Sequence, residues 1–135
     1  MTEPPRIRVL IADDVAGMRR LLRFTLEESG RFEVVGEAAD GEQAVRLAQE
    51  TRPDLVLLDV SMPVQSGLEA LPRLREQVPG ARVVVLSGFL EGMLAAKALS
   101  LGAARYMEKG AKPDALVDAL LDVMSLSSPV AEGGA

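Results

Sequence analysis

The chain has 135 residues, of which 48% are hydrophobic, so it can form one domain with a core of ordinary size. Its 15 basic and 20 acidic residues give a net charge of -5, which argues against the basic surface of a nucleic-acid-binding domain. Because the sequence contains neither cysteine nor histidine, it excludes disulfides, thiolate and histidine metal sites, a Ser-His-Asp triad and a histidine phosphocarrier.

The first strand-like run is the apolar segment Arg6–Ala12. The segment Val15–Ser29 has the period of an amphipathic helix, and Gly30 is its predicted C-cap. Four apolar residues at helical spacing form the predicted stripe of this helix: Met18, Leu21, Leu22 and Leu26.

A second strand, a second helix and a third strand follow. The segment Arg31–Ala38 is predicted as a strand, and Asp40 is a suitable N-cap for a helix over Glu42–Thr51. The third strand, Pro53–Asp59, is nearly continuous in its apolar character, which is typical of a strand buried on both faces.

The alternation of helix and strand continues through the next four segments. The segment Ser66–Val78 is predicted as a helix that Pro72 should bend or confine to a short first turn. Ala81–Ser87 is the fourth strand, Glu91–Leu101 an alanine-rich helix, and Ala104–Lys109 a short fifth strand.

The last predicted helix is Pro113–Leu126, which begins with a proline at a favourable position. Its predicted buried face consists of Leu116, Ala119, Leu120 and Val123. Five strand–helix units in a row predict an α/β domain over residues 1–126, with a parallel sheet and helices on both faces. Residues 127–135 are small and polar, and are predicted to be a flexible tail or a truncated linker.

Polar residues stand at the ends of four of the predicted strands. Asp13 and Asp14 follow the first strand, Asp59 ends the third, Ser87 the fourth and Lys109 the fifth. Singly, such an aspartate is most often a helix N-cap, the serine a turn residue and the lysine a surface charge. In an open α/β sheet, however, ligands bind at the carboxyl ends of the strands, and the joint pattern predicts a site there.

The residue types indicate the chemistry of that site. Clustered carboxylates without His or Cys favour Mg²⁺, with Mn²⁺ as an alternative, and such a cation would offset the repulsion between adjacent aspartates. A carboxylate can also act as a nucleophile and form an aspartyl phosphate. The sequence has no Walker A motif, so we expect no ATP binding through a P-loop.

The stretches "LIADD", "LLDVSMPVQSG", "VVVLSG" and "GAARYMEKG" resemble the receiver domain of two-component response regulators. The resemblance covers roughly residues 6–126. It implies a flavodoxin-like (βα)5 fold, a doubly wound five-stranded parallel sheet with strand order 2-1-3-4-5. It also implies a phosphorylation-dependent signalling module. Such a module is not an enzyme; it assists only its own phosphorylation and slow dephosphorylation.

The resemblance assigns a role to each residue of the cluster. Asp59 would be the phosphoacceptor, and Ser87 and Lys109 would bind the phosphoryl group. The ligands of Mg²⁺ would be Asp13, Asp14, Asp59 and the backbone carbonyl of Ser61. Ser87 and Tyr106 would form the switch, although Tyr106 could equally be an aromatic residue that fills a strand end.

Partners also follow from the resemblance. The phosphoryl donor would be a histidine kinase or a histidine phosphotransfer protein, with Met18, Arg19 and Arg20 as candidate contacts; a core methionine with two solvated arginines is an equal alternative. The surface of the fourth helix, fifth strand and fifth helix would act on a downstream protein or a missing output domain, or form a homodimer. We expect no nucleic acid bound by this chain itself. With no run of about 18 apolar residues, no signal peptide and no cysteine, we expect no membrane span and a cytoplasmic location.

Three positions depart from the pattern of the family. Gly110 replaces the proline that commonly follows the lysine, so we expect a trans Lys109–Gly110 bond and a different loop. Only Gly67 remains of two frequent glycines in the loop after "MP". Ser61 and Phe89 occupy the positions that tune dephosphorylation, which makes fast self-dephosphorylation less favourable.

Other function classes remain as alternatives. A phosphatase with an aspartyl nucleophile usually has a second Asp two residues later, where this chain has Ser61. A flavin-binding module of the same fold would need a Gly- and hydroxyl-rich phosphate loop after the first strand. A phosphate-independent interaction module usually lacks one of the key residues. A fragment of a DNA-binding transcription regulator would have lost its output domain.

Overall fold

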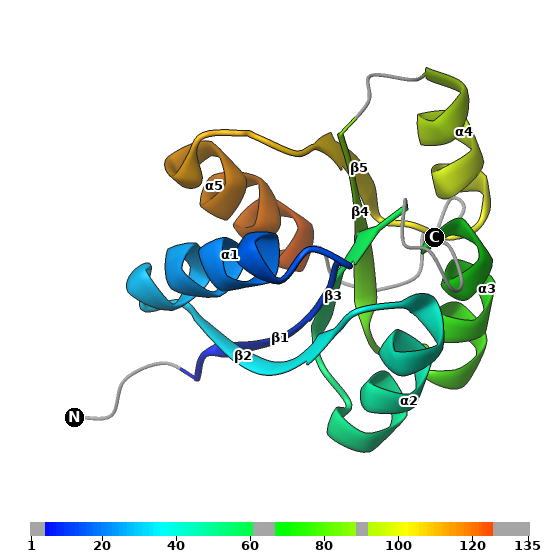
Figure 1. Cartoon of the computed structure of the whole chain (residues 1–135), viewed down its shortest axis with the longest axis horizontal. Helices are drawn as coiled ribbons and strands as arrows, with labels where there is room; N and C mark the ends of the chain where they lie inside the picture. The colour runs from blue at the N-terminus through cyan, green and yellow to red at the C-terminus, as the bar shows by residue number, and fades with distance from the viewer. Residues whose placement is uncertain (1–4, 61–66, 89–91, 126–135) are drawn as a thin grey trace.

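Five parallel strands form one sheet in the order β2-β1-β3-β4-β5 in the computed structural model of the chain, which describes residues 5–60, 67–88 and 92–125 (Figure 1). The predicted fold and strand order are therefore confirmed. The strands are β1 Ile7–Ala12, β2 Phe32–Ala38, β3 Leu55–Asp59, β4 Arg82–Ser87 and β5 Arg105–Glu108. The helices within these residues are α1 Ala16–Glu28, α2 Gly41–Thr51, α3 Gly67–Gln77, α4 Gly92–Ser100 and α5 Pro113–Met124.

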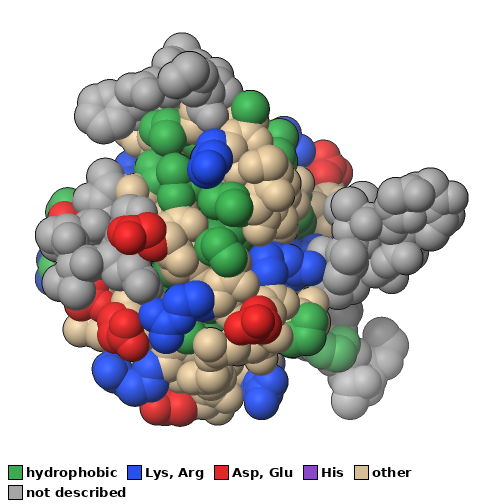
Figure 2. Space-filling model, turned by 90° about the vertical axis from the view of Figure 1, so that its right-hand side faces the viewer, with side chains coloured by type: hydrophobic (Ala, Val, Ile, Leu, Met, Phe, Trp, Pro, Cys, Tyr) green, Lys and Arg blue, Asp and Glu red, His purple; other side chains and the backbone are tan. Residues whose placement is uncertain are grey.

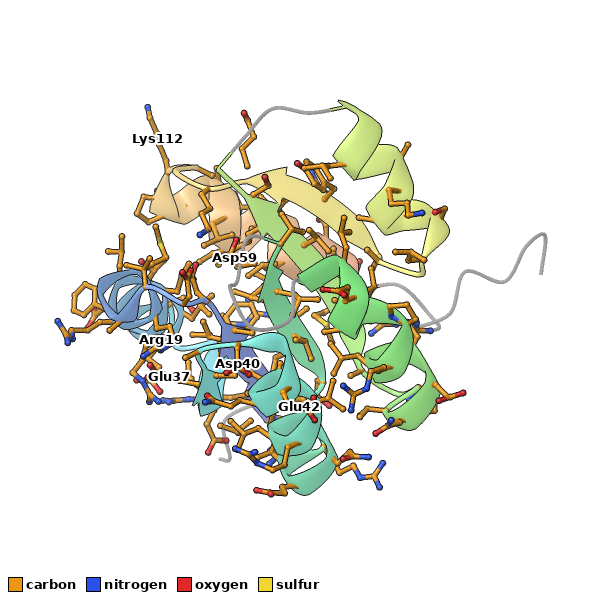
Figure 3. All side chains as sticks on the ribbon, turned by 45° about the vertical axis from the view of Figure 1, so that its right-hand side comes forward. Arg19, Glu37, Asp40, Glu42, Asp59 and Lys112 are labelled. Atoms are coloured by element: carbon orange, nitrogen blue, oxygen red, sulfur yellow. The ribbon has the colours of Figure 1, made fainter. Side chains whose placement is uncertain are left out.

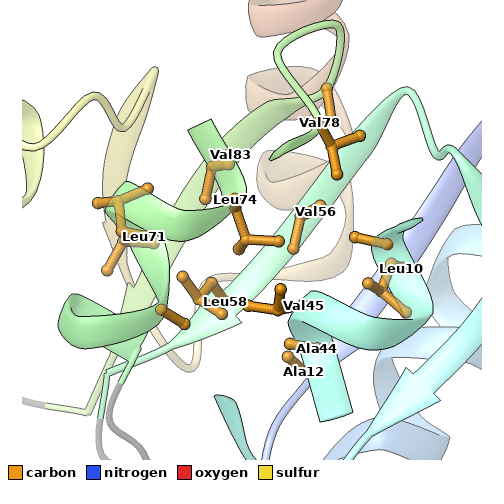
Figure 4. Packing of buried hydrophobic residues seen from close by; sticks show 14 of the residues in the cluster. Leu10, Ala12, Ala44, Val45, Val56, Leu58, Leu71, Leu74, Val78 and Val83 are labelled. Carbon is orange, nitrogen blue, oxygen red and sulfur yellow. The ribbon is translucent and has the colours of Figure 1, made fainter. Parts of the chain in front are cut away.

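The helices cover the sheet on both faces, with α1 and α5 on one side and α2, α3 and α4 on the other (Figure 1). Successive side chains of a strand point to opposite faces, so each central strand contributes to two cores. In β1, Val9 and Ile11 face α1 and α5, whereas Leu10 and Ala12 face the other layer. Figure 4 shows this second core, in which side chains of the sheet meet those of α2 and α3.

The edge strand β2 contains one residue more than its pairing with β1 requires. Val9 pairs with Val34 and Leu10 with Gly36, so Val35 is an extra residue that forms a bulge. Before the bulge, β2 packs its alternate residues against α1; after it, Ala38 belongs to the core on the α2 side. The residue between Gly36 and Ala38, which is Glu37, therefore projects on the α1 side.

Two expectations about the helices are confirmed and two are corrected. Asp40 caps α2, since its carboxylate accepts from the Gln43 N–H at 2.8 Å, and Gly30 ends α1 directly after the C-cap residue Ser29, with a φ of 76°. Leu21 is 57% exposed rather than part of the buried stripe, because α1 packs through residues that repeat every four positions. The helix α3 continues through Pro72 to Gln77, so this proline does not confine it. The predicted tail, residues 127–135, lies outside the described residues.

The α2–α3–α4 side of the molecule presents a mixed surface. Figure 2 shows hydrophobic side chains in the upper part of this face and Lys and Arg interspersed with Asp and Glu below them. One interhelical ion pair on this side joins Arg73 of α3 to Glu42 of α2 at 3.2 Å.

Candidate functional site

Polar residues from four strands meet at the carboxyl edge of the sheet. Asp13 directly follows β1, Asp59 is the last residue of β3, Ser87 the last of β4, and Lys109 follows β5. Asp13, Asp59 and Ser87 are each no more than 1% exposed. The crossovers of a parallel sheet place all its strand ends at one edge, which is why residues so far apart in sequence share this site.

Lys109 bridges the two buried carboxylates. Its Nζ lies 2.8 Å from Asp13 Oδ2 and 3.2 Å from Asp59 Oδ2. Partial burial on its own lowers the pKa of Lys109, but the hydrogen bond to Asp13 and the charge of Asp59 outweigh it and raise this pKa above its ordinary value. Lys109 is therefore a cation over the whole physiological pH range.

Backbone hydrogen bonds hold these residues in place. The Asp13 N–H donates to the Ala38 carbonyl at 2.9 Å, and Asp13 Oδ1 accepts from the Val15 N–H at 2.9 Å. The Lys109 N–H donates to the Ser87 carbonyl at 2.7 Å. The site is thus built on the rigid ends of β1, β4 and β5.

The carboxylates are arranged closely enough to share a cation. One carboxylate oxygen from each of Asp13, Asp14 and Asp59 can be chosen so that all three lie within 4.8 Å of one another. Oxygen-only ligands suit a hard divalent cation such as Mg²⁺, which retains several waters and demands few carboxylates. The donor set therefore fits Mg²⁺ or Mn²⁺. Ser61, whose carbonyl is the fourth expected ligand, lies outside the described residues.

Gly67 has a role at the site that the sequence did not reveal. A Cβ atom at this position would lie 2.2 Å from the carbonyl oxygen of Asp59 and 2.8 Å from its carbonyl carbon. The first residue of α3 therefore packs directly on the backbone of Asp59, and only glycine fits. Both Gly67 and the strand that ends in Asp59 were predictable from the sequence, but the contact between them was not.

The remaining candidate residues lie around this centre. Tyr106 is half-buried in β5, pairs with Val85 and packs against the core on the α2 side. In α1, Arg20 is exposed and Met18 lines an apolar cavity between α1 and the start of α5. Arg19 is half-buried and donates to the backbone of Asp13.

The peptide bond after Lys109 is trans, as expected, since the described residues contain no cis bond. Gly110 has a φ of 91°, a backbone conformation that favours glycine. Phe89, one of the two positions expected to tune dephosphorylation, lies outside the described residues.

Comparison with known sequences and structures gives consistent matches. Residues 9–121 match the family of the response regulator receiver domain. The chain is 40% identical to the uncharacterized transcriptional regulatory protein YhcZ of Bacillus subtilis, over 82% of this chain and 52% of YhcZ. It is 35% identical to the chemotaxis protein CheY of Thermotoga maritima, over 84% of this chain and 93% of CheY.

A solved structure extends this likeness to the fold. The response regulator domain of Thermotoga maritima CheB superposes with a TM-score of 0.84 at 30% identity, covering 91% of this chain and 99% of that one. The chain spans about half the length of YhcZ but almost all of CheY. Across the residues that the structure describes, no helix combines the length and apolar character that crossing a membrane requires.

Proposed function

Because this chain belongs to the response regulator receiver domain family, we propose that it is a cytoplasmic signalling module that is phosphorylated on Asp59. The observation that carries this proposal is the Lys109 bridge between two buried carboxylates, with Asp14 beside them. The phosphoryl donor is a histidine kinase or a histidine phosphotransfer protein.

The charges of the site explain its need for a cation. Three carboxylates and one ammonium leave a net charge of about -2, which one divalent cation balances. Asp13, Asp14 and Asp59 would hold Mg²⁺, together with the Ser61 carbonyl. The chemistry that Mg²⁺ supplies when bound is neutralisation of the phosphoryl oxygens during transfer.

The transfer itself uses Asp59 as the nucleophile. One of its carboxylate oxygens forms a bond to phosphorus while the phosphorus–nitrogen bond of the donor's phosphohistidine breaks, and the released imidazole takes up a proton from water. Lys109 lies 3.2 Å from Asp59, so its ammonium can move to a phosphoryl oxygen with little displacement. The hydroxyl of Ser87, at the end of the neighbouring strand β4, donates a hydrogen bond to a second phosphoryl oxygen.

This chemistry is tested by a small phosphodonor. The purified chain is incubated with acetyl phosphate and Mg²⁺, and its intact mass is measured; we expect one added phosphoryl group, and none when EDTA removes the metal. Asp59→Asn should abolish the addition, whereas Asp118→Asn, which changes an exposed carboxylate of α5, should keep it. A phosphoryl group retained by Asp59→Asn, or one stable to mild base, would place the acceptor elsewhere.

Phosphorylation would act on the surface of α4, β5 and α5. Movement of the Ser87 hydroxyl towards the phosphoryl group would leave space beside β4 into which Tyr106 rotates, a packing change biased by one new charge. The surface would then signal to a downstream protein, an output domain or a second copy of the chain. The likeness to YhcZ supports an output domain that regulates transcription.

The switch is tested with beryllofluoride, which mimics the phosphoryl group. Backbone NMR shifts are compared with and without it in the presence of Mg²⁺. We expect changes at Tyr106 and along α4 as well as around Asp59. Changes confined to the surroundings of Asp59 would contradict the switch.

A further inference from the structure

The guanidinium of Arg19 joins α1 to the backbone of the site. Its Nη1 donates to the carbonyl oxygen of Asp13 at 2.6 Å, and its Nε donates to Glu37 Oε1 at 3.2 Å. The Arg19 side chain is only 18% exposed. Two charge-assisted or short hydrogen bonds on a mostly buried guanidinium hold it in one orientation.

Glu37 is in turn held by a second arginine of the same helix. Arg23 Nε donates to Glu37 Oε2 at 2.7 Å, so each carboxylate oxygen of Glu37 binds one arginine. Partial burial on its own raises the pKa of Glu37, but Arg23 and then Arg19 outweigh it and lower this pKa below its ordinary value. Glu37 is therefore ionised at neutral pH and anchors Arg19; Figure 3 shows the two side chains next to each other.

The carbonyl that Arg19 binds belongs to the peptide group between Asp13 and Asp14. Because this group is planar, fixing its carbonyl also sets the direction in which the backbone of Asp14 continues. The Asp13 side chain has partners of its own in Val15 and Lys109. The Asp14 carboxylate is exposed and has no such partner within the described part of the chain.

We propose that Arg19 is a positioning residue for the metal site: through the Asp13 carbonyl it holds the Asp14 carboxylate in the place where the cation binds, with Glu37 as its anchor. This inference rests on the proposed function, in which Asp14 is a ligand of Mg²⁺. It differs from the kinase contact expected for Arg19 from the resemblance, because a positioning residue acts on metal binding when no kinase is present.

The experiment is a titration of the full chain with Mg²⁺ alone, followed through the NMR signals of the Asp13 and Asp14 backbone amides. The Kd for Mg²⁺ should rise about tenfold in Arg19→Ala, as for residues that orient metal ligands. It should rise about threefold in Arg19→Lys, because one ammonium lacks the fork that serves two acceptors. Arg23→Ala is the matched control: Arg23 also binds Glu37 but makes no contact with Asp13, so its Kd should change by less than about twofold.

The outcomes separate this inference from the proposed function. A wild-type Kd in Arg19→Ala, or in Arg19→Lys if the alanine variant does not fold, would overturn the inference. Equal losses in Arg19→Ala and Arg23→Ala would overturn it too, since they would report a general loosening of α1. If the wild-type chain showed no Mg²⁺ response at Asp13 and Asp14, the proposed function would fail and the inference with it.

Discussion

Replacing Gly67 with alanine should damage both the stability of the fold and the chemistry at Asp59. The new Cβ would lie 2.2 Å from the Asp59 carbonyl oxygen, whereas ordinary contacts begin at 3.4 Å, so α3 and β3 must separate by about 1.2 Å. Such overpacking costs about 1–3 kcal/mol. For a chain of this length, that lowers the melting temperature by roughly 4–12 °C. A misplacement of about 1 Å at a reacting group can reduce its rate about 100-fold.

Two measurements check this expectation against a matched alanine variant. Thermal unfolding gives the stability, and the rate of phosphorylation by acetyl phosphate in Mg²⁺ gives the chemistry. Gly17→Ala is the control, because its Cβ would meet nothing within 4 Å, and alanine in α1 should stabilise the chain by about 0.5 kcal/mol. A Gly67→Ala chain with wild-type melting temperature and rate would refute the reasoning that α3 packs on the backbone of Asp59.

Three further expectations follow from single contacts. Lys109→Met should cost about 2 kcal/mol at neutral pH without metal, because it removes the ammonium that lies between the buried carboxylates of Asp13 and Asp59. Since the folded-state pKa of Lys109 is raised, urea unfolding should show this difference shrinking as the pH rises through that pKa. Glu37→Gln should cost less than about 1 kcal/mol; because the pKa of Glu37 is lowered in the folded state, the difference should be fully present above the unfolded-state pKa and be lost as the pH falls through the folded-state pKa. Asp40→Ala should lower the unfolding free energy by about 1 kcal/mol and Asp40→Asn should not, since only alanine removes the cap on the Gln43 N–H.

The order of the strands and the edge at which the site lies were predictable from the sequence. Apolar runs alternating with helical segments define a parallel sheet, and a parallel sheet gathers its strand ends at one edge. The proximity of Asp13, Asp59 and Lys109 could therefore be predicted from the sequence. The distances of 2.8 Å and 3.2 Å from Lys109 to the two carboxylates could not, because they depend on the loop that Gly110 shapes.

Contacts between elements escaped prediction because local periodicity does not record them. Leu21 fits a helical stripe in sequence, yet it lies beside the packed line of α1 and is exposed. Pro72 predicts a bend or a short first turn, but α3 continues past it to Gln77 and tolerates the loss of one backbone hydrogen bond. Arg19 and Glu37 lie 18 residues apart on different elements, and with Val35 present Glu37 faces α1 because of the bulge in β2.

Because of the bulge, β2 has one residue more than it has positions paired with β1. What decides the face on which a side chain lies is therefore its odd or even position along the paired residues (its parity), rather than the length of the strand. A chain lacking Val35 would have an unbulged strand in which Glu37 still faces α1 and Ala38 still faces α2, and the Arg19–Glu37 pair should survive this deletion. Deleting Leu57 from β3, which has no spare residue, would instead turn every later side chain of that strand over, Asp59 included. Insertions and deletions among relatives of this chain can thus be sorted by whether they keep the residues at the strand ends on the same face of the sheet, whatever residue types are inserted or lost.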